Sequence, residues 1–203
     1  MRVNSLHRII VGITMSEVKS TIDLIMEKTR GMKLTAEEKD QNRKEKIKRE
    51  VRLLVLPYLR GEASLGRLRE SLSDETLMSA VEVLGEALQI EEDNSRALEG
   101  LRALCGKEKG MASMLEDIRT VLEEYEAHRS QVRTRLESEM LQELARWGIS
   151  GPAVQPAVDA NPLWLDQRKE LEKNYTPRLR DAADRLVTSC EKMRSESSQN
   201  SDV

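Results

Sequence analysis

Aromatic residues are scarce in this chain of 203 residues, which has two Trp, three Tyr and no Phe. Such a composition does not fit a two-sheet β-sandwich, because strands favour aromatic and β-branched side chains. Apolar runs are short as well, and none approaches the ~20 residues that a membrane-spanning helix needs. Two cysteines are too few for a disulfide-stapled secreted domain, and they fit a reducing compartment.

Neither sign of charge is in large excess. The chain has 33 Lys and Arg residues and 36 Asp and Glu residues, so its net charge is −3. This balance excludes a wholly basic nucleic-acid binder. His7 and Arg8 interrupt the apolar stretch near the N-terminus, which argues against a signal peptide, so we expect a cytoplasmic protein. Residues 1–14 are either a short strand or tail, or a non-native extension if translation starts at Met15.

Apolar residues recur with the period of an α-helix along almost the whole chain, which predicts an all-α fold. We expect a helical N-terminal region over 16–105. Within it, Thr35 and Glu38 form a capping box that opens a charged helix over 36–58. That helix is polar on nearly every side and therefore needs solvent or ion pairs around it. It is expected to stop at two helix-breaking residues, Pro57 and Gly61.

A second feature of this region is a local resemblance. Ala80 and Ala87 lie seven residues apart in one predicted helix, and an acidic–Asn turn at 93–94 precedes the next helix. Residues 80–101 therefore resemble the junction between consecutive tetratricopeptide repeats. Glu92 stands where that family has a proline, and no second copy follows at the repeat period of 34. The resemblance implies a helical hairpin rather than a peptide-binding array.

A long antiparallel, coiled-coil-like helical hairpin is predicted over 111–194, after a Gly-bounded loop at 106–110 that is the best candidate for an internal boundary. Apolar residues starting at Met111 predict a first helix of about 37 residues, which needs a partner along its seam. A second apolar stripe supplies that partner, with Thr176-Pro177 as either a fresh helix start or a kink. Residues 195–203 are polar and expected to be disordered.

The connection between the two long helices, 148–162, is rich in Pro and Gly, yet it carries apolar side chains and is flanked by the chain's two tryptophans. Loops of this length in compact proteins are commonly functional or disordered. Two interpretations stand: the apolar residues plug the open end of the hairpin, or they form a docking site for a partner. The residues concerned are Trp147, Ile149, Val154 and Trp164.

Residues suited to catalysis are few. The chain has two histidines, His7 and His128, and the latter is expected to be a solvated residue in the middle of the long helix. Cys105 and Cys190 lie on apolar helical faces, where a thiol behaves as a small hydrophobic group. No known catalytic, phosphate-binding or metal-binding motif occurs. We therefore predict no enzymatic activity, no cofactor, no metal and no small-molecule substrate.

Two functions remain. The first is a non-enzymatic interaction or scaffold protein, which pairs as a homodimer or with another helical protein because its narrow apolar stripes bury little surface in a monomer. The alternative, not favoured, is a nucleic-acid- or ribosome-associated protein that uses the basic part of the charged helix, 39–52, where no aromatic side chain is available for stacking. A membrane partner is not expected. The cationic residues of that helix are Arg43, Lys44, Lys46, Lys48, Arg49 and Arg52.

Overall fold

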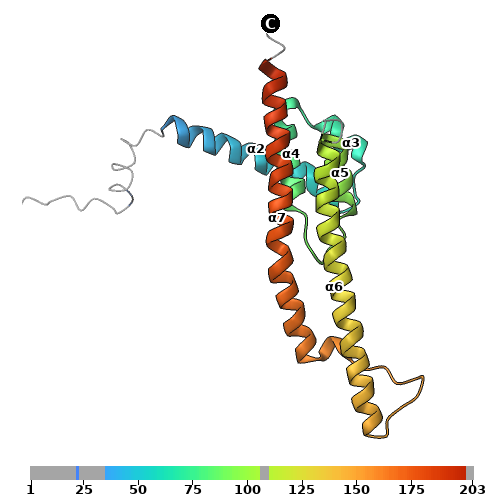
Figure 1. The fold of residues 1–203 in the computed structure, drawn as a ribbon. Coiled ribbons are helices and arrows are strands. Elements are labelled where there is room, and N and C mark those ends of the chain that lie inside the picture. Colours follow the sequence, from blue (N-terminus) through green and yellow to red (C-terminus); the bar gives the residue numbers. More distant parts are fainter. Residues whose placement is uncertain (1–21, 23–34, 106–109, 200–203) are drawn as a thin grey trace, which may run out of the picture. The chain divides into compact units, whose positions relative to one another are not determined.

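A computed structural model describes residues 22, 35–105 and 110–199, with side chains up to 195. The chain divides into two compact units, residues 1–43 and 44–203. The described ranges are helical and contain no strand, which confirms the predicted all-α class (Figure 1). The elements are α2 (Ala36–Leu59), α3 (Leu65–Ser71), α4 (Asp74–Glu86), α5 (Ser95–Cys105), α6 (Met111–Arg146), the 3₁₀ turn η1 (Val158–Ala160) and α7 (Pro162–Gln199).

Several expectations fall on residues outside this description: the start of the chain at 1–14, most of the helical N-terminal region before residue 35 and most of the loop at 106–110. The predicted disordered tail, 195–203, is described in part. There α7 continues to Gln199, so the expectation is wrong for the first five residues of that segment. Adding a residue to an existing helix costs little compared with starting one, which explains why the polar sequence stays helical.

Helix α2 begins and ends at recognisable signals. The backbone N–H of Thr35 donates to Glu38 Oε2 at 2.8 Å, and the N–H of Glu38 donates to Thr35 Oγ1 at 3.2 Å, which confirms the capping box. Pro57 does not end the helix, contrary to expectation, and lies inside it. The helix ends at Leu59, and Gly61, with a φ of 81°, closes a Schellman turn in which the N–H of Glu62 donates to the Pro57 carbonyl.

One hydrophobic core unites the short helices with the proximal part of the α6–α7 pair. Val51, Val55 and Tyr58 of α2 are buried in it beside residues of α4, α5, α6 and α7. The Tyr58 hydroxyl donates to the Arg96 carbonyl at 2.8 Å, and Arg96 Nη1 donates back to the Tyr58 carbonyl at 3.0 Å. The predicted N-terminal region and the predicted hairpin thus share a single core.

The hairpin between α4 and α5 is present, as the local repeat resemblance implies. Its turn depends on Asn94, which is buried and whose side chain donates to the carbonyls of Gln89 and Glu92 and accepts from the Gln89 N–H. Asp93 Oδ1 accepts the N–H of Ser95 at 2.9 Å and so caps the start of α5.

Helices α6 and α7 lie side by side and run in opposite directions (Figure 1). Helix α6 has 36 residues, close to the expected length. Helix α7 is continuous through Pro177, so Thr176-Pro177 is not a fresh helix start. Supercoiling of the pair stays a prediction. None of the described helices combines the length and the hydropathy that crossing a membrane demands.

The packing of α5 on α4 makes a testable prediction at Gly100. A Cβ there would lie 2.9 Å from Leu84 Cδ1 and 3.2 Å from Tyr58 Cε1, and both side chains are fully buried. Gly100→Ala is expected to destabilise the protein by about 1–3 kcal/mol in urea unfolding, because overpacking outweighs the gain in helix propensity. Gly66→Ala is the matched control, since its nearest atom is 3.9 Å away, and it is expected to be neutral or stabilising. A more stable Gly100→Ala protein would contradict the observed packing.

Candidate functional site

The far end of the α6–α7 hairpin has a small apolar cluster of its own, separate from the main core. Leu136 of α6, Val158 of η1 and Trp164 of α7 are buried against each other, and Val132 and Met140 pack around them. Trp164 is 2% exposed. It therefore acts as the plug that the sequence predicts as one of two roles for this loop.

An ion pair fixes the returning chain to α6 beside the plug. Arg133 Nη1 and Nη2 donate to the two oxygens of Asp159 at 2.6 and 3.1 Å, and the Arg133 guanidinium lies 5.8 Å from the centre of the Trp164 ring. The hydrogen bond from Arg133 holds the pKa of Asp159 below its usual value. This geometry orients η1 even though both charged groups contact solvent.

Helix α7 starts at an Asn-Pro pair. Asn161 Oδ1 accepts the N–H of Leu163 at 2.9 Å, and Pro162 occupies the first helical position, where its missing N–H costs nothing. The Asn161 amide also donates to the Met140 sulfur at 3.3 Å, which ties the start of α7 to α6.

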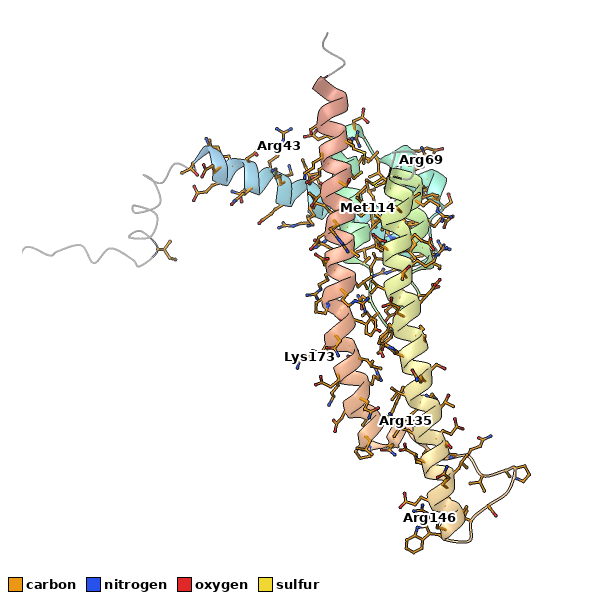
Figure 2. The ribbon with its side chains drawn as sticks, viewed as in Figure 1. Arg43, Arg69, Met114, Arg135, Arg146 and Lys173 are labelled. Atoms are coloured by element: carbon orange, nitrogen blue, oxygen red, sulfur yellow. The ribbon has the colours of Figure 1, made fainter. Side chains whose placement is uncertain are left out.

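Helix α6 continues past the start of α7 and ends at Arg146 (Figure 2). Gly148 has a φ of 76°, and its N–H donates to the Ala145 carbonyl while the N–H of Ile149 donates to the Leu144 carbonyl. These two bonds form a Schellman motif. The motif sets the position of Trp147, the C-cap residue, and of Ile149 directly after it.

Large apolar side chains are exposed around this end of the hairpin. Trp147 is 77% exposed and Ile149 is 51% exposed. We define the tip surface as the five exposed large hydrophobic residues of this region: Leu141, Trp147, Ile149, Leu163 and Leu165. Exposed apolar residues mark an interaction site when they form a contiguous patch, whereas single exposed ones are normal on monomeric proteins.

The four residues predicted for this loop divide between the two interpretations. Trp164 is buried in the plug, Trp147 and Ile149 are exposed, and Val154 is half-buried. Sequence reasoning missed Leu141, Leu163 and Leu165. The sequence does contain a signal for Leu163 and Leu165. Both flank Trp164 in the first turn of a helix, so if Trp164 is buried, its two neighbours point to other faces of that helix.

A polar network crosses the middle of the hairpin and joins it to the turn between α4 and α5. Tyr125 donates to Glu91 Oε1 at 2.8 Å, Arg168 pairs with the same carboxylate, and the Tyr175 hydroxyl lies 2.5 Å from His128 Nδ1. Burial alone would raise the pKa of Glu91, but hydrogen bonds from Arg168 and Tyr125 outweigh it and lower that pKa. His128 is exposed, as expected, yet it is hydrogen-bonded rather than only solvated.

A groove of about 880 Å³ lies along α4 and α7. Its floor is apolar, and its rim carries six carboxylates against the cations Lys48 and Arg180. None of the lining side chains is a histidine or a cysteine. The carboxylates are Glu82, Glu86, Glu91, Glu92, Glu172 and Asp184.

Ion pairs engage several of the predicted cationic residues of α2. Lys48 Nζ lies 3.1 Å from Glu82 and 2.6 Å from Glu86, and Arg52 lies 2.7 Å from Glu86. Lys46 faces Glu50 one turn along, at 3.9 Å. Lys44 and Arg49 are exposed, and Arg43 belongs to the first compact unit. Their role as an anion-binding surface stays a prediction.

The model of a family of unknown function, DUF6657, matches residues 68–188, more than half of the chain. The chain belongs to DUF6657. The DUF6657 match begins in α3 and ends in α7, so it includes the tip surface and leaves out the basic residues of α2. No curated protein and no solved structure matches the chain.

The two tryptophans of this DUF6657 protein are predicted to respond oppositely to mutation. Trp164→Ala is expected to lower the free energy of unfolding by about 3 kcal/mol, because it empties the plug. Trp147→Ala is expected to change it by less than about 0.5 kcal/mol, because its side chain contacts mainly solvent. Urea unfolding followed by circular dichroism measures both. Equal losses for the two variants would refute the assignment of plug and exposed residue.

The Lys48–Glu86–Arg52 ion pairs predict an acid dependence of stability. Burial raises the pKa of Glu86, but hydrogen bonds from Lys48 and Arg52 prevail and lower it from 4.5. A group whose pKa is lower in the folded state than in the unfolded state stabilises the fold above pH 4.5. This stabilisation is lost as the pH falls through the folded-state pKa. Glu86→Gln is therefore expected to cost about 0.5–1 kcal/mol at pH 7 and to converge with wild type in acid.

Thermal melting between pH 7 and pH 3 measures that convergence. Glu62→Gln, at an exposed glutamate after α2, is the control and is expected to follow the wild-type profile. A constant difference between Glu86→Gln and wild type across this range would show that the ion pairs do not account for the loss.

Proposed function

We propose that this protein is a non-catalytic interaction protein that binds another protein chain through the tip surface. The observation that carries the proposal is the distribution of its aromatic side chains. Of the five in the chain, Tyr58, Tyr125, Tyr175 and Trp164 are buried, and Trp147 alone is exposed. A folded chain so poor in aromatics has no structural use for one in solvent, whereas Trp is enriched among the residues that dominate binding energy at interfaces.

The way the tip is held also supports a binding role. The Schellman motif at Gly148 constrains the backbone next to Trp147, while the Trp164 plug and the Arg133–Asp159 ion pair hold the chain where it returns to the hairpin. A surface that is already ordered loses less conformational entropy on binding than a mobile loop does. Helix α6, with 36 residues, spans about 54 Å and carries the tip away from the main core.

The non-catalytic part of the proposal rests on how the reactive side chains are used. The hydroxyls of all three tyrosines are hydrogen-bonded within the network or the core, and Glu86 and Glu91 are held by cations. Both thiols are buried. These groups stabilise the packing of the helices, and no cofactor is needed for that role.

The alternative, association with nucleic acid or ribosomes, has less support. Lys48 and Arg52, two of the six cationic residues it would use, already pair with Glu82 and Glu86. Phosphate would have to compete with these carboxylates. Salt-dependent retention on heparin that is lost when Lys44 and Arg49 become Gln would reverse this preference.

The partner is either a second copy of this chain or a different helical protein, and we expect the interaction in the cytoplasm. A homodimer would cover the apolar tip of both copies through one two-fold contact. Light scattering on the purified protein distinguishes the two cases, because a dimeric mass shows self-association.

The test compares Trp147→Ser with Leu53→Ser. Leu53 is 69% exposed on α2, so the control removes a comparably exposed apolar side chain outside the tip. Trp147→Ser is expected to weaken dimerisation, or capture of a stoichiometric partner from a cell extract, by roughly tenfold or more, while Leu53→Ser has no effect. Both variants are expected to melt like wild type. A loss caused by Leu53→Ser and not by Trp147→Ser would move the interface to α2 and overturn the proposal.

A further inference from the structure

The chain's only two cysteines meet in the main core. Cys105 and Cys190 are 85 residues apart in the sequence, and their sulfur atoms lie 3.3 Å from each other. Both side chains are buried, at 0% and 2% exposure. The sequence predicts each thiol as a small hydrophobic group on a helix face, and it gives no sign that α5 and α7 bring the two faces together.

A metal site does not explain this pair. Two thiolates alone leave a tetrahedral zinc ion without half of its ligands, and no group of three His, Cys, Asp or Glu side chains able to hold a metal forms among the residues that the structure describes. A disulfide needs only the two sulfurs. Its bond length is about 2.05 Å, so each sulfur would move by roughly 0.6 Å from its present position.

The two thiols also lie where the core ends. Cys105 is the last residue of α5, and Cys190 is the last fully buried residue of α7 among those described. Beyond Cys190, the helix continues to Gln199 with exposed or half-buried side chains up to 195. Ends of helices with few buried contacts open locally at little cost in free energy. Unwinding the last turns of α7 would therefore admit a small oxidant to Cys190 first.

We propose that Cys105 and Cys190 form a redox-sensitive dithiol that a hydroperoxide converts to an intramolecular disulfide. The Cys190 thiolate attacks the peroxide oxygen, which breaks the O–O bond, forms a sulfenic acid and releases water or an alcohol. The Cys105 thiolate then attacks the sulfenic sulfur, forms the S–S bond and releases water. In sum, two thiols and one hydroperoxide give one disulfide, one alcohol and one water, and the sulfurs lose two electrons to the peroxide.

The disulfide would join the end of α5 to the C-terminal part of α7 across a sequence separation of 85 residues, and the closed loop would contain α6 and α7 up to Cys190. A cross-link over so long a loop reduces the freedom of the unfolded chain, so the oxidised protein is expected to melt on the order of 10 °C higher than the reduced one. This inference is independent of the tip surface and of any partner.

The experiment uses the full chain, first reduced and then treated with hydrogen peroxide at about one equivalent. After unfolding and alkylation, intact mass spectrometry is expected to show a monomer that has lost two hydrogens and takes up no alkylating reagent. Digestion is expected to give a linked peptide containing Cys105 and Cys190. Thermal melting with and without reductant gives the shift in melting temperature.

Cys105→Ala and Cys190→Ala are the matched controls. Each is expected to lose the linked peptide and the effect of peroxide on melting. Because either variant could be unstable, the mass result on the wild-type protein decides by itself. Two alkylated thiols after peroxide, oxygen addition to a single cysteine as the main product, or a covalent dimer would each overturn the proposal.

Discussion

The close packing of α7 against both α4 and α6 is the contact on which the rest of this fold depends. Small residues line this contact: Gly85 of α4 faces Ala183 of α7, and a Cβ added at Gly85 would make ordinary contacts, 3.9 Å from Ala183 Cβ and 3.5 Å from Val187 Cγ2. Leu179, Ala182 and Leu186 are buried on the same stretch of α7. Since the chain has few aromatic side chains, aliphatic and small residues make up most of this core.

Three tyrosines supply the aromatic side chains of this core, and the hydroxyl of each also makes a hydrogen bond. Tyr58 ties α2 to α5, while Tyr125 and Tyr175 join α6 and α7 in an edge-to-face contact with ring centres 5.7 Å apart. Burial, with Glu99 nearby, raises the pKa of Tyr58 to about 12, so its phenol stays protonated and remains a donor. These contacts specify which helix faces meet, which apolar stripes of leucine and valine alone do not.

Local signals in the sequence were sufficient for much of the fold. The capping box at Thr35 and the length of α6 depend on residues close together in the chain, and both predictions are confirmed. Pro57 and Pro177 were misread or left open, because a proline stops a helix only when packing on either side does not hold it. The meeting of the two thiols depends on long-range packing and has no local signal.

In the candidate site, too, the sequence indicates local features but not those that depend on how the helices pack. Trp147 and Trp164 are residues of the same type and flank the same loop, so the sequence alone does not indicate which of them is buried. The difference arises because α6 runs past the start of α7 as far as Arg146 (Figure 2). Trp164 is buried beside α6, whereas Trp147 follows the end of α6 and is exposed. The two apolar clusters of the compact unit have no residue in common. Separate clusters give separate cooperative units, so amide protons around the plug should exchange through openings that leave the helices near Tyr58 intact.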